Sequence, residues 1–258
     1  MLNIARSTTT ADVGVFGGSG FYQFLTDVET IEIDTPYGPP SEAPLIGSIG
    51  DRRVAFIPRH GNSHSIPAHR VNFRANIWTM AALGVRALIA PFACGSLRAD
   101  LDRGHLVVVD QLVDRTSGRD GTFFDGPETW HQPFADPYDA ALGAVLADVG
   151  RAQRLTVHEG GTVVVIGGPR FSTRAESAWH RQMGWDLVNM TQAPEAALAA
   201  EAGLPYVGIG LVTDFDAGLD KDPTIAPVTQ EDVFAYLRSN ASNMADLLMT
   251  AIPRFDLA

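Results

Sequence analysis

The segment Pro194–Asp216, PEAALAAEAGLPYVGIGLVTDFD, decides the fold of this chain. Its first half has the composition of a helix, with Pro194 suited to the first helical position and Gly203 just beyond the end at Ala202. Its second half, Tyr206–Thr213, is almost continuously apolar, as a strand buried on both faces should be. The segment therefore predicts one helix–strand unit of an α/β protein.

The same alternation recurs along the rest of the chain. Short apolar runs punctuated by Gly and Pro predict five more strands, over Asp12–Phe16, Arg53–Ile57, Ala87–Pro91, Leu106–Val109 and Thr162–Ile166. Helical spacing of apolar residues predicts four more helices, over Val71–Leu83, Tyr138–Val149, Thr173–Met183 and about Gln230–Thr250. No repeat or linker interrupts the pattern, so we expect a single domain over residues 1–258, with a largely parallel or mixed sheet.

Composition and charge argue against several classes of protein. The 258 residues are 45% hydrophobic, which is ordinary for a globular domain, and no apolar run is long enough to span a membrane. The net charge of −11 argues against broad nucleic-acid binding. A single cysteine, Cys94, and the lack of an apolar leader favour a cytoplasmic protein. There is no G-K-[ST] phosphate loop, and Schiff-base chemistry would depend on Lys221, the only lysine.

Two carboxylates, Asp214 and Asp216, directly follow the strand Tyr206–Thr213. Ligands of α/β sheets bind at the carboxyl ends of strands, and residues two apart in an extended chain share a face. Burial and a nearby like charge both raise the pKa of a carboxyl group, and a neutral acid near pH 7 can protonate a leaving nitrogen. The alternative is an exposed acidic loop, since Asp220 and Asp222 follow closely.

Two other strand ends carry groups suited to an anion. The turn at residues 17–20, GGSG, offers backbone N–H groups and a hydroxyl, although a tight turn without a ligand is an equal reading. Its glycine spacing does not match a dinucleotide-binding fingerprint. Arg59 offers a planar guanidinium suited to phosphate, and we expect it, His60 and His64 to contact phosphate or sugar. A metal site with His69 as third ligand is a weaker alternative.

Two further residues near strand ends have competing interpretations. Cys94 is interpreted as a small buried residue and not as a catalytic thiolate, because no His–Asx spacing points to it. Phe171 precedes a predicted helix whose first turn has Thr173 and Glu176 at capping-box spacing. The Phe171 ring belongs either to the core or to a site for an aromatic ligand, and taken alone it favours the core.

Together these motifs resemble the trimeric branch of the purine nucleoside phosphorylase superfamily, and within it the S-methyl-5′-thioadenosine phosphorylases. The resemblance covers nearly the whole chain and rests on seven stretches in the correct order: Gly14–Tyr22, Thr35–Ser41, Pro58–Trp78, Ala93–Leu97, Gly167–Glu176, Asn189–Tyr206 and Thr213–Gly218. It implies a nucleoside phosphorylase fold, in which a central mixed, partly barrel-like β-sheet is flanked by helices. It also implies phosphate, ribosyl and base subsites side by side.

The resemblance assigns residues to these subsites. Phosphate would lie among Ser19, Arg59, His60, Ala93 and Thr191. The substrate-binding residues would be Met190 against the sugar, Phe171 against the purine, Asp214 at N7, Asp216 at the exocyclic amino group, and Ser172. His64 matches a position near phosphate and sugar, and His131 matches a histidine that crosses into a neighbouring subunit's site near the 5′ group. The catalytic residues would be Asp214, Asp216, Arg59 and His60.

The implied reaction is phosphate-dependent cleavage of the N-glycosidic bond of a purine nucleoside, with 5′-methylthioadenosine giving adenine and 5-methylthioribose 1-phosphate. The alternatives are a phosphorylase of 6-oxopurine nucleosides or methylthioinosine and, in another class, a non-catalytic nucleoside-binding module. Inorganic phosphate would be a co-substrate, with no cofactor and no metal. We expect a homotrimer, with a hexamer made of two trimers as the alternative, and no nucleic-acid or membrane partner.

Two departures from the family pattern bear on affinity and base preference. Phe92 stands where the family often has a threonine whose hydroxyl faces phosphate. The aspartate pair is followed by Ala217-Gly218, and branches with this ending include enzymes for 6-oxopurines. An ionised Asp216 suits a 6-amino group and would repel a 6-oxo group, so we expect the aspartate pair to decide the base.

Overall fold

β5 (Ala87–Ser96) is the strand around which the sheet is arranged. In the computed structural model, which describes residues 2, 4–17, 25–218 and 228–257, β11 (Tyr206–Asp214) runs parallel along one edge of β5. On the other edge, β1 (Val13–Gly17) pairs with the start of β5, and β10 (Leu187–Asn189) pairs antiparallel with its end. From Ala90 to Cys94 this second edge has no strand partner among the described residues.

The gap between β1 and β10 explains where the sequence prediction of β5 was wrong. The predicted strand, Ala87–Pro91, ended before the observed end at Ser96, and proline lacks the N–H that a central strand donates. The strand continues to Ser96, since Pro91 lies where one edge of β5 is unpaired. The gap also leaves the backbone around Ala93 accessible to side chains from other elements.

The remaining strands extend the sheet on both sides. Beyond β1 lie β4 (Arg52–Pro58), β3 (Leu45–Ile49) and β2 (Thr26–Thr30). Beyond β11 lie β6 (Leu106–Val108) and β8 (Val157–Glu159). Beyond β10 lie β9 (Thr162–Ile166) and β7 (Gln111–Arg115).

Two bent strands close part of this sheet into a barrel. Only Val109 and Asp110 separate β6 from β7, and only Gly160 and Gly161 separate β8 from β9. The two bends lie together, because the Gly161 N–H donates to the Asp110 carboxylate over 2.9 Å. β5 pairs with β11, β11 with β6, and β6 with β8. Across the bends β6 continues as β7 and β8 continues as β9, β7 pairs with β9, β9 pairs with β10, and β10 pairs with β5, which closes the ring. The partly barrel-like mixed sheet is confirmed.

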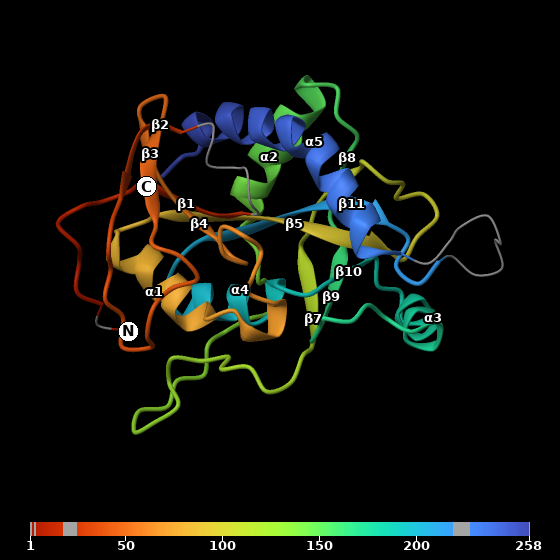
Figure 1. Ribbon diagram of the computed structural model, residues 1–258, viewed down its shortest axis with the longest axis horizontal. Coiled ribbons are helices and arrows are strands. Elements are labelled where there is room, and N and C mark those ends of the chain that lie inside the picture. The colour runs from red at the N-terminus through yellow and green to blue at the C-terminus, as the bar shows by residue number, and fades with distance from the viewer. Residues whose placement is uncertain (1, 3, 18–24, 219–227, 258) are drawn as a thin grey trace.

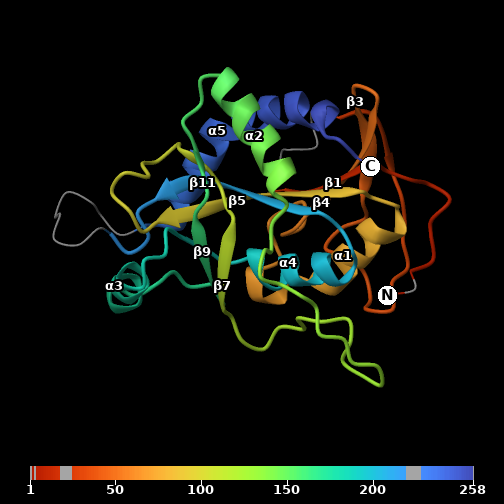
Figure 2. The same cartoon turned by 180° about the vertical axis from the view of Figure 1, so that it is seen from behind.

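Helices cover both faces of the sheet (Figures 1 and 2). α1 (Phe73–Ala82) and α4 (Gln192–Glu201) pack together on one face, and α2 (Ala140–Ala152) and α5 (Gln230–Ala251) pack together on the other. α3 (Arg174–Gln182) lies at one side of the molecule. Both faces of the central strands are thus buried.

Neighbouring residues of the central strands point alternately into two buried clusters, which is why these strands are apolar at nearly every position. Phe16 and Ile57 belong to the cluster with α1 and α4, and both are 0% exposed. Val15 and Phe56 belong to the cluster with α2 and α5. β1 and β4 are therefore buried on both faces, and β1 lies between β4 and β5.

The α/β fold and the elements predicted from sequence are confirmed, with five strands missed: β2, β3, β7, β8 and β10. Within α4, Ala193 has extended φ and ψ angles, so regular helical turns begin at Pro194, as predicted. Ser19 and Lys221, singled out in the sequence, lie outside the described residues. Over the described ranges, no helix is both long and apolar enough to cross a membrane.

Candidate active site

Asp214 and Asp216 lie together in a turn at the end of β11. The pairing of β11 with β5 is irregular between Val212 and Asp214, and Asp216 has a left-handed φ of 49°. The Asp216 N–H donates to Asp214 Oδ2 over 2.8 Å, and the two residues are 9% and 3% exposed. They are neighbours through an Asx-type turn, and not through the alternation of an extended strand on which the prediction relied. For these two residues the exposed acidic loop is wrong.

Burial raises the pKa of Asp214 to about 6. The Thr213 hydroxyl donates to Asp214 Oδ1 over 2.7 Å, and this bond and the one from Asp216 N–H favour the carboxylate and limit the rise. A carboxyl group with this pKa is partly protonated near neutral pH. Asp214 is therefore a competent general acid.

Two buried oxygens beside this turn have no hydrogen-bond partner in the part of the chain that the structure describes: Asp216 Oδ2 and Ser172 Oγ. Ser172 precedes α3, and α3 is fastened to the aspartate turn because Arg174 donates to the Ala217 carbonyl over 3.0 Å. Buried polar atoms without partners are costly, and they are typical of sites that bind a polar ligand.

Arg59 and His60 follow β4, and the Arg59 N–H donates to the Gly17 carbonyl over 3.1 Å. The guanidinium is buried, and its Nε and Nη2 donate to the two carboxylate oxygens of Glu195 over 2.6 and 2.7 Å. His60 Nδ1 lies 2.8 Å from the Ile66 carbonyl and therefore carries the proton. Burial and the Arg59 charge lower the pKa of His60 to about 4, so at pH 7 the ring is neutral with Nε2 as an acceptor.

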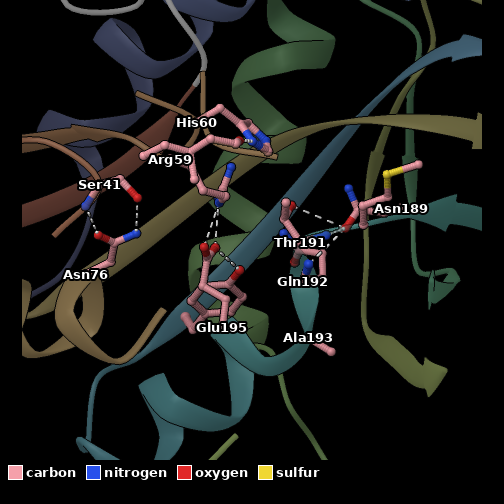
Figure 3. A network of polar contacts seen from close by, with 12 residues as sticks. Ser41, Arg59, His60, Asn76, Asn189, Thr191, Gln192, Ala193 and Glu195 are labelled. Carbon is pink, nitrogen blue, oxygen red and sulfur yellow. Dashed lines mark hydrogen bonds and ion pairs between the residues drawn. The ribbon is translucent and has the colours of Figure 1, made fainter. Parts of the chain in front are cut away.

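A second polar network joins the unpaired edge of β5 to the start of α4 (Figure 3). Asn189 Nδ2 donates to the Ala93 carbonyl over 3.2 Å, and Asn189 Oδ1 accepts the N–H groups of Thr191 and Gln192 over 2.6 and 2.8 Å. Asn189 thus brings together Ala93 and Thr191, two residues expected at phosphate. Glu195 lies one turn further along α4, so the Arg59 guanidinium meets the same helix (Figure 3).

Met190 lies where the loops after β9 and β10 meet. Gly168 has a left-handed φ of 64°, which favours glycine, and a Cβ there would lie 2.6 Å from Met190 Sδ, so the two loops are in close contact. Arg119 donates to the carbonyls of Met190, Ala193 and Gly167 over 2.8, 2.5 and 2.8 Å. It therefore ties the segment that leads to Phe171 and Ser172 to the turn that carries Met190 and Thr191.

The histidines that the sequence analysis singled out differ in their surroundings. The His64 ring is 4.6 Å from the His60 ring and 5.0 Å from the ring of Phe234 in α5. His131 is exposed in the loop 116–139, which projects from the molecule between β7 and α2 (Figure 1). His69 is also exposed, and the described residues contain no group of three or more side chains placed to hold a metal ion.

The aromatic and thiol candidates differ in burial. Cys94 is 3% exposed and its thiol donates to the Leu211 carbonyl, which confirms the interpretation as a buried residue; burial raises its pKa. Phe92 is also buried, and its ring lies against Gly210 in β11. Phe171 is half-buried at the start of the segment before α3.

These groups combine a general acid, a buried guanidinium and a set of hydroxyl and amide donors. Such a site can hold an anion on one side of a substrate and protonate a leaving group on the other. The profile of the phosphorylase superfamily matches residues 12–253 of the chain. The chain belongs to the phosphorylase superfamily.

The names of similar proteins indicate which class of substrate this phosphorylase cleaves. An S-methyl-5′-thioadenosine phosphorylase from Mycobacterium tuberculosis is 50% identical over 243 residues, which are 94% of this chain and 89% of the relative. A purine nucleoside phosphorylase from Streptomyces coelicolor is 45% identical over 250 residues, 94% and 88% of the two chains. The structure of methylthioadenosine phosphorylase from Schistosoma mansoni in complex with adenine superposes with a TM-score of 0.88 at 37% identity, covering 94% of this chain and 91% of that one.

The protein is thus an enzyme of the pentosyltransferase class, and the reaction that its relatives support is phosphorolysis of a purine nucleoside. This excludes the interpretation as a non-catalytic nucleoside-binding module.

Sequence reasoning missed several residues that hold the site of this phosphorylase in place. Glu195, Asn189, Arg119 and Thr213 each contact a residue expected at the site or its backbone. Asn189 and Glu195 lie in a stretch that the motif comparison included, but their types are common at strand ends and on helices. Only the contacts with distant segments distinguish them.

Proposed function

We propose that this phosphorylase converts 5′-methylthioadenosine and inorganic phosphate to adenine and 5-methylthioribose 1-phosphate. The aspartate turn carries the proposal, because it combines a general acid, Asp214, with an unpartnered carboxylate oxygen on Asp216. The relative from Mycobacterium tuberculosis is named for this substrate, and the similar structure from Schistosoma mansoni holds adenine, a 6-aminopurine.

In this mechanism a phosphate oxygen forms a bond to C1′ as the bond from C1′ to N9 breaks. The electron pair of that bond goes to the purine, and Asp214 gives its proton to N7, so the base leaves neutral. The enzyme supplies no covalent nucleophile, since phosphate is the nucleophile, and its work is positioning and charge stabilisation. Arg59, His60, Ala93, Thr191 and Ser19 would hold phosphate, and Met190 and His64 would lie near the sugar.

Base preference follows from Asp216. Its Oδ2 is buried without a partner, so a 6-amino group that donates a hydrogen bond would satisfy it. A 6-oxo group would instead place an oxygen against the carboxylate. Sites that must hydrogen-bond a substrate group discriminate by about 10⁴-fold. Phe171 and Ser172 would complete the base subsite.

We also propose that the enzyme is a homotrimer in which His131 enters a neighbouring subunit's site near the 5′ group. The support is the projecting loop 116–139, where His131 is exposed beside Trp130, which is 52% exposed. Large exposed aromatic side chains are typical of surfaces that contact another protein.

The test is to incubate the enzyme with methylthioadenosine, adenosine and inosine, each with and without phosphate, and to follow release of the free base. We expect cleavage of methylthioadenosine that requires phosphate and exceeds cleavage of inosine by at least 100-fold in kcat/KM. Equal cleavage without phosphate would make the enzyme a hydrolase and would end the proposal.

Phosphorolysis of 6-oxopurine nucleosides or methylthioinosine is the second candidate. Ala217-Gly218 after the aspartate pair favours it, and the relative from Streptomyces coelicolor is named simply for purine nucleosides. In the same assay, faster phosphorolysis of inosine or methylthioinosine than of methylthioadenosine would establish this second function.

A further inference from the structure

Glu195 is a fully buried carboxylate that the mechanism above does not use. It is 0% exposed in α4, and its only ion-pair partner among the described residues is Arg59, which is 3% exposed. Arg59 Nε donates to Oε2 over 2.6 Å, and Arg59 Nη2 and the Tyr206 hydroxyl both donate to Oε1 over 2.7 Å. Every oxygen of the carboxylate is thus hydrogen-bonded, and one of its partners is expected at phosphate.

Stability alone is a weak reason for a fold to contain such a pair. Removing two charges from water costs free energy that their mutual attraction recovers only in good geometry, and apolar side chains of similar volume often serve the fold as well. A buried and fully bonded ion pair does, however, fix the orientation of the guanidinium. The fixed orientation of the Arg59 guanidinium, and not a gain in stability, is therefore the property of this pair that calls for an explanation.

The geometry leaves one nitrogen of Arg59 for a ligand. A guanidinium binds an anion through its N–H groups, and Glu195 occupies the edge formed by Nε and Nη2. The remaining nitrogen, Nη1, has no hydrogen-bond partner in the described part of the chain. The two hydrogen bonds to Glu195 fix the plane of the Arg59 guanidinium, whose Cζ lies 5.7 Å from the centroid of the Phe16 ring, and the Tyr206 hydroxyl in turn donates to Glu195 Oε1.

We propose that Glu195 is a positioning residue for phosphate: it holds the Nε–Nη2 edge of Arg59, so that Nη1 is directed at the anion. Tyr206 supports it by fixing Oε1. The inference rests on the proposed function, since it assumes that phosphate binds beside Arg59, His60 and Thr191. It adds that Glu195 acts on phosphate only through Arg59.

The central experiment is Glu195→Gln. An amide has one acceptor oxygen and carries its own N–H groups, so it can hold only one of the two Arg59 nitrogens and repels the other. We expect the KM for phosphate to rise about 10- to 100-fold, the cost of a displaced reacting group. The affinity for adenine, measured without phosphate by calorimetry, should change less than about 3-fold, since among the described residues no hydrogen bond or ion pair joins Arg59 or Glu195 to Asp214 or Asp216.

A double-substitution cycle tests whether the effect passes through Arg59. Arg59→Met with Glu195→Met removes both charges and leaves none buried and unpaired, so this variant should fold even if Glu195→Gln does not. We expect Glu195→Met to raise the phosphate KM at least 10-fold in the presence of Arg59 and less than about 2-fold in the Arg59→Met background. Equal factors in both backgrounds would overturn the proposal.

Leu146→Ala is the control for loss of stability. Leu146 is 0% exposed in the cluster with α2 and α5, away from the pair, so its truncation should lower stability without changing either substrate's KM. A normal phosphate KM in Glu195→Gln, with wild-type cleavage dependent on phosphate, would end this inference alone. Wild-type cleavage that ignores phosphate would instead end the proposed function.

Discussion

Asp214 is held in a site that makes its ionised form costly, and this is useful to an acid catalyst. Asp214→Asn should preserve the turn, because the amide oxygen can accept from Asp216 N–H while the amide nitrogen donates to Thr213 Oγ1. Thr213 can then donate to the Cys94 carbonyl, 3.3 Å away. We expect the kcat for phosphorolysis to fall about 10²-fold or more. At pH 8 the free energy of unfolding of the variant should exceed that of the wild type by on the order of 1–3 kcal/mol.

The pH dependence of that gain has a definite sign. The pKa of Asp214 is about 6 in the folded protein and near its ordinary value of 3.8 in the unfolded chain. The folded protein therefore holds this proton more tightly, and wild-type stability from this group is lost as the pH rises from about 4 to 6. Urea unfolding at pH 4 and pH 8 checks this. An equal difference between variant and wild type at both pH values would contradict it.

Site residues could be predicted from the sequence where both the residue type and its position after a strand indicated a ligand-binding role. Asp214, Arg59 and His60 directly follow apolar strands, so their sequence context alone indicated a site. Glu195 was not predictable, because its partner Arg59 is 136 residues away and nothing local separates it from a helix-surface glutamate. The same holds for Arg119, whose partners are three backbone carbonyls of other segments.

At the scale of elements, the strands marked by continuous apolar runs were found, and the strands without such a run were missed. β2 is exposed at all five positions and reads TDVET, so no apolar pattern marks it. β8 and β10 are three residues long and read VHE and LVN, so neither has the longer apolar run that marks β6. These strands form because neighbouring strands offer unpaired edges, a property of the assembled sheet and not of their own sequences.

The contact between β5 and the aspartate turn gives a prediction at this scale. A Cβ at Gly95 would lie 2.8 Å from Asp214 Oδ2 and 3.0 Å from the Asp216 backbone, so Gly95→Ala must displace the turn from β5. We expect kcat/KM to fall about 100-fold, because Asp214 would no longer meet the base. Gly121→Ala is the control, since its Cβ would meet only Pro194 at 3.6 Å. Equal activity of the two variants would show that the turn tolerates displacement.

At the scale of the whole molecule, the first part of the loop 116–139 is attached to the body of the protein, and the rest of the loop projects from it. Arg74 pairs with Asp120 and Asp125, and Glu201 accepts from the Phe123 N–H, so the first part of the loop is fixed to α1 and α4. The loop then projects beyond α1 and α4 (Figure 2), and Trp130 and His131 in it are exposed. An arm that is anchored at its base and exposes Trp130 and His131 suits contact with another copy of the chain.

Mixing two defective subunits tests whether that arm completes a neighbouring site. His131→Ala subunits keep Asp214 but would offer neighbours no histidine, whereas Asp214→Asn subunits keep His131 but lack the acid. In a cyclic assembly formed at random from equal amounts of both, about a quarter of the sites would pair an intact Asp214 with a neighbour's intact His131. Co-expressed subunits should therefore exceed the mean activity of the two separate variants. Activity equal to that mean would show that His131 serves no neighbouring site, since the gain requires that acid and histidine come from different chains.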